Sequence, residues 1–237
     1  MAQFLLIHGS CHGAWCWDHV LPFLNIGPHQ ARAIDLPARG ADRSPIAAAA
    51  LTRDAQAILA AITRPVILVG HSMAGYPITA AAELAPEKIV ALVYLCAYVP
   101  RSGMSLADMR RAGPHQPLAP AIRVAKGRQS FSFDPERIAN VFYHDCPAEA
   151  LELARRNLCP EPITPQETPL ILTGRSANVA RHYIRCTEDR AIPPAYQQSM
   201  TTGWPAANVT TLSTSHSPFF AAPQALAQRL IEIAETI

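Results

Sequence analysis

The chain has few charged residues and lacks the sequence features that mark several large classes of protein. Charged residues make up 16% of its 237 residues and hydrophobic residues 49%, a composition too apolar for a disordered protein. It has no run of basic residues: they come at most in adjacent pairs such as Arg110–Arg111, and the formal net charge is only +2. The sequence therefore offers little support for a nucleic-acid partner.

Long apolar runs are also missing. None reaches the roughly 18 residues that a membrane-spanning helix needs. The first apolar run, Phe4–Ile7, is too short for a secretory signal peptide and ends at the polar His8. We therefore expect a cytoplasmic protein with no membrane partner.

No two cysteines form a C-x-x-C pair, and no secretory signal precedes them, so reduced thiols are expected rather than a disulfide framework. Cys96 and Cys186 stand in apolar runs, where cysteine packs as a small hydrophobic residue. The six cysteines are Cys11, Cys16, Cys96, Cys146, Cys159 and Cys186.

Metal and cofactor motifs are absent as well. There is no H-E-x-x-H, no G-x-x-x-x-G-K-[ST] and no G-x-G-x-x-G. His8 and His12 are four residues apart, but glycines surround them, which indicates a loop rather than one face of a helix. We expect no metal site and no cofactor.

Apolar runs typical of strands alternate with segments of helical periodicity. This alternation predicts a mostly parallel, doubly wound α/β sheet with helices on both faces. The length suits one such domain. The expected strands are 4–7, 32–36, 66–69, 89–99, 182–187 and 209–212, and the expected helices are 51–62, 73–84 and 223–237.

The segment 101–180 interrupts this alternation. It is rich in proline and contains two short helical patterns, at 138–142 and 148–158. We interpret it as a lid, or cap, inserted between two strands of a core made of 1–100 and 181–237; a long irregular crossover is the alternative. Its aromatic residues could line an apolar pocket or form the core of the lid: Phe131, Phe133, Phe142 and Tyr143.

The most informative motif is Gly70–Gly75, which follows the expected strand 66–69 and opens an alanine-rich helix. In a nucleophile elbow, a serine on such a sharp turn needs small neighbours two residues away. Ala74 stands where glycine is usual, and is small enough. The motif predicts Ser72 as the nucleophile and the Met73 N–H as one oxyanion donor. An ordinary strand-to-helix turn with a capping serine is the alternative.

A serine hydroxyl needs an adjacent base, and in this arrangement the chain order is serine, acid, histidine. His216 lies after the last short strand and before the final helix, where the base is expected. Asp189 lies just after the strand 182–187 and is the predicted acid, with Glu188 as its nearest rival. Three further carboxylates lie in the insert and fit less well: Asp108, Asp134 and Asp145.

The second oxyanion donor should come from the loop after the first strand. Gly9 would let the backbone approach the site closely, and the N–H of Ser10 is the predicted donor. A plain loop turn is the alternative.

These motifs together resemble the plant methylesterase and hydroxynitrile lyase family of α/β-hydrolases and its bacterial esterase relatives, which include pyrethroid hydrolases. The resemblance covers nearly the whole core and is weakest across the lid. It implies a Ser72–Asp189–His216 triad, oxyanion donors at Ser10 and Met73, a small helical lid over an apolar pocket, and a possible homodimer. The matching segments are 8–17, 35–37, 70–75, 183–189 and 215–219.

Two departures bear on the activity. The plant lyases of this family have threonine where this chain has Gly9, and lysine where it has Ser217. Both positions favour a serine carboxylic-ester hydrolase that acts on small, apolar or aromatic esters through an acyl-enzyme, with Gly9 and Phe131 assigned to the substrate pocket. The alternatives are a C–C lyase using the same triad and a non-catalytic small-molecule receptor on the same fold.

Overall fold

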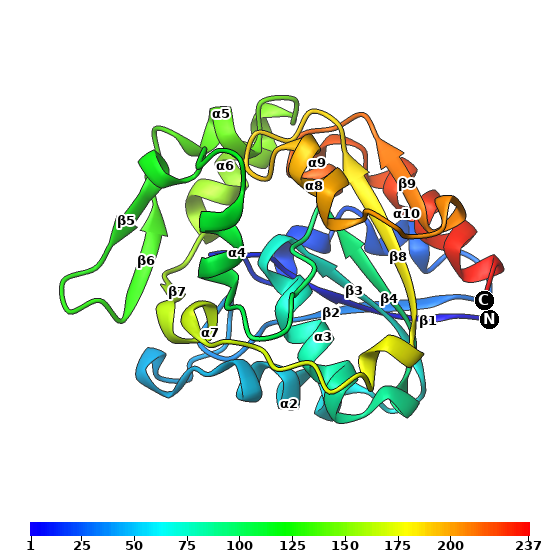
Figure 1. The fold of residues 1–237 in the computed structure, drawn as a ribbon. Coiled ribbons are helices and arrows are strands. Elements are labelled where there is room, and N and C mark those ends of the chain that lie inside the picture. The colour runs from blue at the N-terminus through cyan, green and yellow to red at the C-terminus, as the bar shows by residue number, and fades with distance from the viewer.

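A six-stranded parallel sheet forms the centre of the protein in a computed structural model that describes residues 1–237 (Figure 1). The strand order is β2-β1-β3-β4-β8-β9, and every neighbouring pair is parallel. All six residues of β3 are buried, as expected for a strand covered on both faces. The strands are β1 Gln3–Ile7, β2 Gln30–Ile34, β3 Val66–His71, β4 Ile89–Leu95, β8 Ala180–Cys186 and β9 Val209–Leu212.

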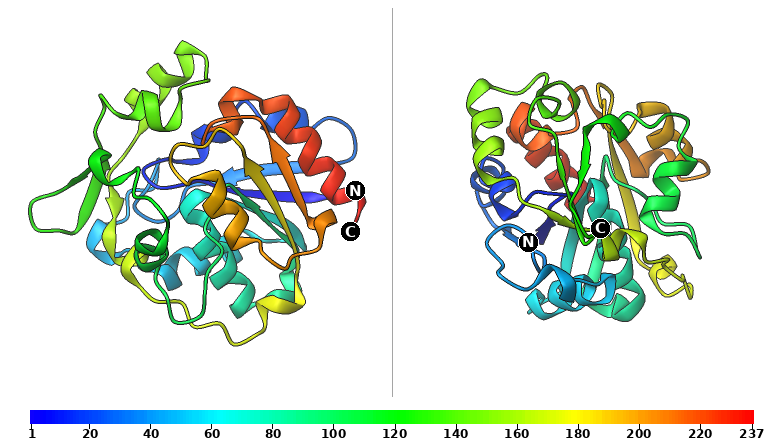
Figure 2. Two further views of the ribbon diagram at one scale, coloured as in Figure 1. Left: turned by 45° about the horizontal axis from the view of Figure 1, so that its top comes forward. Right: turned by 90° about the vertical axis from the view of Figure 1, so that its left-hand side faces the viewer.

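Helices cover both faces of this sheet, so the doubly wound α/β expectation is confirmed (Figures 1 and 2). α2 packs against α3 on one face, and α1 packs against α10 on the other. None of the helices combines the length and the apolarity required to cross a membrane. The helices around the sheet are α1 Leu21–Leu24, α2 Leu51–Ala61, α3 Gly75–Leu84, α8 Pro194–Met200, α9 Pro218–Ala221 and α10 Pro223–Glu235.

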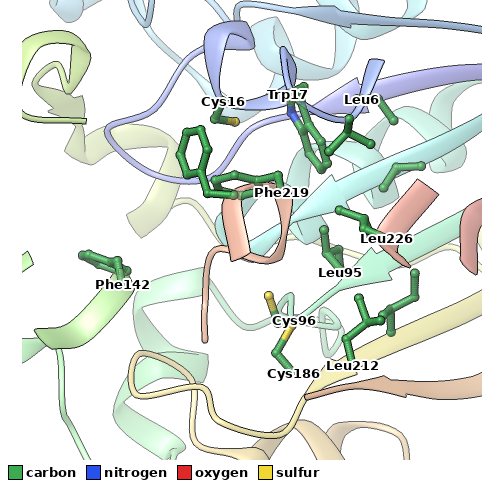
Figure 3. Packing of buried hydrophobic residues seen from close by; sticks show 14 of the residues in the cluster. Leu6, Cys16, Trp17, Leu95, Cys96, Phe142, Cys186, Leu212, Phe219 and Leu226 are labelled. Carbon is green, nitrogen blue, oxygen red and sulfur yellow. The ribbon is translucent and has the colours of Figure 1, made fainter. Parts of the chain in front are cut away.

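Alternate residues of each strand feed two separate hydrophobic clusters, because successive side chains of a strand point to opposite faces. In β4, Val93 and Leu95 join the cluster on the α1 and α10 face, whereas Leu92 and Tyr94 join the one on the α2 and α3 face. All six cysteines are free thiols. Figure 3 shows part of the first cluster, including Trp17, Leu95, Cys96, Cys186, Phe219 and Leu226.

Most of the chain between β4 and β8, as far as α7, forms a separate layer over one end of the sheet, away from both termini, and the rest runs back along α3 to the start of β8 (Figures 1 and 2). It contains a small antiparallel sheet in the order β5-β6-β7. We propose that this segment, 101–180, is the lid. Its elements are α4 Leu106–Ala112, β5 Ile122–Val124, β6 Ser130–Phe133, α5 Ile138–Phe142, α6 Ala148–Asn157, β7 Glu161–Pro162 and α7 Ile163–Glu167.

Two features differ from the expected pattern. β4 ends at Leu95 rather than near position 99, because Cys96 has a φ of 35° and turns the chain out of the sheet. The segment that follows packs on the chain beside Ser72, where the Tyr98 N–H donates to the Ser72 carbonyl at 3.1 Å. The three lid strands have only two to four residues each, too few for a period-two pattern to predict.

Candidate active site

Ser72 lies at the junction of β3 and the helical turn that leads into α3. Its φ of 56° is in the left-handed region, which non-glycine residues rarely adopt and which stores backbone strain. This turn presents the hydroxyl to a cavity at the carboxyl end of the sheet. A strained serine between a buried strand and a helix has the geometry of a nucleophile elbow.

Close backbone packing explains the small residues around Ser72. A Cβ at Gly70 would come within 2.9 Å of the Ala74 carbonyl oxygen. A Cβ at Gly75 would come within 1.9 Å of the carbonyl oxygen of Tyr98, in the segment after β4. Gly75 is therefore needed for the elbow to pack against that segment.

Three of the predicted side chains form one hydrogen-bonded line. His216 Nε2 lies 2.9 Å from Ser72 Oγ, and His216 Nδ1 lies 2.7 Å from Asp189 Oδ2. All three residues are buried, which strengthens these contacts relative to the same contacts in water. The imidazole is thus held in the tautomer with Nδ1–H toward the carboxylate and Nε2 free to accept the serine proton.

The loop after β8 holds Asp189 rigidly. Its Oδ1 accepts the N–H groups of Ala191 and Ile192 at 2.7 and 2.9 Å. Its Oδ2 accepts a third bond from Nε2 of the fully buried Gln197, on α8, at 2.9 Å. The rival acid Glu188 is exposed and accepts a bond from the neighbouring threonine instead.

The loop that carries His216 is fixed from two sides. The carboxylate of Asp145, in the lid, accepts the Ser215 N–H at 2.7 Å. His71 Nε2 donates to the His216 carbonyl at 2.8 Å. Burial, with His216 nearby, lowers the pKa of His71 well below its ordinary value, so His71 stays neutral and serves as a fixed support.

The loop after β1 contributes the second predicted amide donor. Ser10 and Met73 both line the cavity. The Ser10 N–H has no acceptor within the protein, and the Met73 N–H lies in the first turn of a helix, where amides lack an intrahelical acceptor. Gly9 is not among the lining residues; a Cβ there would meet His71 Nδ1 at 2.6 Å and Ser72 Cβ at 3.0 Å.

Two side chains orient Ser10. Nδ1 of His12 donates to the Ser10 carbonyl at 2.8 Å, and Tyr143 donates its hydroxyl to Nε2 of His12 at 2.6 Å. Burial lowers the pKa of His12 to about 3, so its ring stays neutral and keeps this pattern. Gln166 of α7 donates to Ser10 Oγ at 2.8 Å.

A buried ionic network joins the lid to the same loop. Glu161, on β7, accepts the Cys11 N–H at 2.8 Å and pairs with Arg39 Nε at 2.9 Å. Arg39 also pairs with Asp54 of α2 at 2.9 Å, and all three side chains are fully buried. Burial raises the pKa of Asp54 to about 6, against the opposing effect of Arg39. The lid therefore helps to hold the loop that carries Ser10.

Half of the residues that line the cavity beside Ser72 are hydrophobic, and most of these belong to the lid. Phe131, predicted as a pocket residue, lines it, and so do Phe133 and Phe142. Tyr143 does not line it, and its hydroxyl is hydrogen-bonded to His12. No aspartate or glutamate is among the lining residues, which are Ser10, His12, His71, Ser72, Met73, Tyr98, Leu106, Arg110, Leu118, Phe131, Phe133, Phe142, Gln166 and His216.

One group of side chains brings metal-ligating atoms together. Such atoms of His71, Cys96 and His216 lie within 4.8 Å of one another. Both nitrogens of His216 are already hydrogen-bonded, as is Nε2 of His71. Burial raises the pKa of the Cys96 thiol well above its ordinary value, which opposes the thiolate form that binds metals. The donor set fits a metal poorly.

Comparison with known proteins agrees with this geometry. Residues 4–229 match the alpha/beta hydrolase family. The chain belongs to that family. It is 30% identical to methylesterase 7 of Arabidopsis thaliana over 98% of this chain and 96% of the relative. It is also 30% identical to a pyrethroid hydrolase of Sphingobium wenxiniae, over 99% and 88% of the two chains.

The solved structures lead to the same group. A pyrethroid hydrolase from Sphingobium faniae superposes with a TM-score of 0.85 at 27% identity, covering 99% of this chain and 97% of that one. The resemblance to plant methylesterases and bacterial pyrethroid hydrolases is therefore confirmed. These relatives support an esterase function for this member of the alpha/beta hydrolase family.

Several residues that support the site could not be identified from the sequence. Gln197, Asp145 and Glu161 lie in segments with no motif, and each acts on a loop at least eight residues away. His12 and Gln166 reach Ser10 only through the folded lid and loop. Only His12 gave a signal, because it belongs to the segment 8–17 that carries the family resemblance.

Proposed function

We propose that the protein is a serine carboxylic-ester hydrolase that acts on small esters with an apolar or aromatic body. The observation that carries this proposal is the continuous line of hydrogen bonds from Asp189 through His216 to a strained Ser72. The aromatic walls of the adjoining cavity support the choice of ester. The esterase relatives support the reaction class.

The proposed mechanism forms an acyl-enzyme. His216 Nε2 takes the proton of Ser72 as Oγ attacks the ester carbonyl, and Asp189 stabilises the resulting imidazolium. The N–H groups of Ser10 and Met73 hold the negative oxygen of the tetrahedral intermediate. His216 then protonates the leaving alcohol. Water repeats the attack on the acyl group with His216 as base, and the acid is released.

The lyase alternative has less support. A threonine at position 9 would bring its Cβ within 2.6 Å of His71 Nδ1, so it could not replace Gly9 without a shift of that ring. Ser217 is fully buried and its hydroxyl has no partner, so no cation stands at that position to stabilise a departing anion. The alternative of a non-catalytic receptor does not explain the hydrogen bonds that join Asp189, His216 and Ser72.

Substitution of the nucleophile tests the proposal. We expect Ser72→Ala to lower kcat for release of 4-nitrophenol from a short acyl ester by at least about 10⁴-fold, with an unchanged melting temperature. Ser44→Ala, at an exposed serine, is the matched control and should keep wild-type turnover. Wild-type turnover in Ser72→Ala would show that the proposed mechanism is wrong.

A further inference from the structure

Arg110 is the only arginine or lysine that lines the cavity. It belongs to α4, which begins at a capping box: Ser105 Oγ accepts the Asp108 N–H at 3.1 Å, and the Asp108 carboxylate accepts the Ser105 N–H at 3.1 Å. Arg110 follows Leu106 by four residues, so the two side chains share one face of the helix. Both line the cavity, with Leu106 as its apolar neighbour.

The guanidinium of Arg110 has no protein partner. No ion pair or side-chain hydrogen bond in the structure involves it, whereas the adjacent Arg111 pairs with Asp108 at 2.9 Å. Burial is the largest effect on Arg110 and lowers its pKa. The neighbouring Tyr98 raises this pKa, the charge of Arg111 lowers it further, and the exposed Glu167 of α7 raises it by less than either. Arg110 is thus a partly dehydrated cation that forms no ion pair.

The surroundings of Arg110 in the cavity suit an anion. The carboxylates of the protein are absent from the walls, and the buried Tyr98, which interacts electrostatically with Arg110, has a hydroxyl with no hydrogen-bond partner. A partly buried charge that lacks a partner costs free energy, and an anionic ligand would offset this cost. The planar fork of a guanidinium matches the two oxygens of a carboxylate.

We propose that the substrate carries a free carboxylate in addition to its ester group, and that Arg110, assisted by the Tyr98 hydroxyl, binds this carboxylate. The substrate class is then a half-ester of a dicarboxylic acid with an apolar or aromatic body. One unpaired cation balances the single charge of a carboxylate, which favours it over a doubly charged phosphate. This assignment rests on the proposed esterase function, because it places the ester at Ser72 and the carboxylate at Arg110.

Matched substrates test this assignment. Mono-4-nitrophenyl esters of dicarboxylic acids of increasing chain length are compared with the same compounds whose free carboxylate is methylated, after subtraction of spontaneous hydrolysis. At the chain length that spans Ser72 and Arg110, we expect kcat/KM for the half-ester to exceed that for the neutral diester by at least about tenfold, mainly through KM. Equal values at every chain length would overturn the proposal.

Variants of the two neighbouring arginines identify the group responsible. Arg110→Gln should lower the ratio of kcat/KM for the half-ester to kcat/KM for the neutral diester by at least about tenfold. Arg110→Lys should keep part of the preference for the half-ester. Arg111→Gln is the control and should keep the whole preference, because that side chain is exposed and paired outside the cavity. An unchanged ratio in Arg110→Gln would contradict the assignment, whatever its effect on either substrate alone.

Direct binding separates this proposal from the proposed function. Calorimetry measures the affinity of the free dicarboxylate for the protein and for Arg110→Gln. If no ester is hydrolysed but the dicarboxylate binds in an Arg110-dependent manner, the esterase proposal fails and the carboxylate site stands. If esters are hydrolysed without charge preference and the dicarboxylate does not bind, the esterase proposal stands and the carboxylate site fails. Tighter binding of a phosphomonoester of matched length would contradict the choice of a carboxylate.

Discussion

The core loops and the lid contribute to the same cavity in different ways. The core supplies Ser72, Asp189 and His216 from loops at the carboxyl ends of β3, β8 and β9, where a parallel sheet brings distant segments together. The lid supplies most of the apolar wall and the unpaired Arg110. We infer that the core determines the reaction and the lid determines which ester enters.

The two regions are also joined differently. Glu161 connects the lid to the loop that carries Ser10 through a fully buried ionic network. Glu83, on α3, holds the last part of the segment 101–180 by accepting hydrogen bonds from Thr173 and Ser176. The first connection reaches the predicted catalytic loop, whereas the second is remote from it. Substitutions at the two sites should therefore separate effects on activity from effects on stability alone.

The largest expected effect is in the core. Asp189→Asn should lower kcat by about 10⁴-fold, because the amide cannot hold His216 in the required tautomer or stabilise its cation. The measurement is kcat for a 4-nitrophenyl ester, with the melting temperature as a check on folding. Glu188→Gln, at the exposed neighbour, should keep kcat within a few-fold of the wild-type value, because substitutions at exposed positions usually have small effects. A similar loss in both variants would contradict the assignment of the acid.

The next effect concerns the connection between lid and core. Glu161→Gln should lower the free energy of unfolding by about 3 kcal/mol, because it removes a buried charge that Arg39 faces. It should also lower kcat, since the Cys11 N–H beside Ser10 loses its carboxylate acceptor. Urea denaturation and ester turnover measure the two effects.

The control for this substitution lies on the lid surface. Glu152→Gln breaks an exposed pair with Arg155, and should cost less than about 1 kcal/mol without changing kcat. Equal losses of stability in the two variants would show that the buried network does not join the regions as inferred.

A smaller, pH-dependent effect is expected at Glu83. Burial raises the pKa of Glu83, but its four hydrogen bonds outweigh burial and lower the pKa from 4.5 to about 2. A lowered carboxyl pKa stabilises the folded state fully above pH 4.5, and this contribution is lost as pH falls toward 2.

Glu83→Gln should therefore cost about 1–3 kcal/mol at neutral pH and progressively less below pH 4.5. Denaturation at a series of pH values measures the difference from wild type. Glu87→Gln, at an exposed residue one turn further along the chain, should show no such dependence. Unchanged kcat in Glu83→Gln would distinguish this connection from that of Glu161.

The smallest expected effect is on the lid wall. Phe131→Ala should lower kcat/KM for an aromatic ester by about tenfold, mainly through KM, because it removes apolar contact with the substrate but no reacting group. Val124→Ala, at an exposed residue of β5, is the control. If Phe131→Ala lowers kcat rather than raising KM, the division of roles between core and lid is wrong.

The same contrast explains how much could be predicted from the sequence. The six strands of the central sheet, the elbow and the line Ser72–His216–Asp189 were predictable, because each depends on a local pattern within or at the end of a strand. The support residues were not, because contacts such as Asp145 with Ser215 join segments that no periodicity relates. Arg110 stood out in the sequence only as part of a basic pair, and its lack of an ion-pair partner inside the cavity appears only in the fold.

The central claim is that Ser72 forms a covalent intermediate, and active-site titration tests it most directly. Diethyl 4-nitrophenyl phosphate, whose adduct on a serine hydrolyses slowly, is reacted with the protein, and the modified peptide is identified by mass spectrometry. We expect a stoichiometric release of 4-nitrophenol, a diethylphosphoryl group on Ser72, and loss of ester turnover in parallel with labelling. Ester turnover that survives complete labelling of Ser72, or a label on another residue that alone abolishes turnover, would contradict the account.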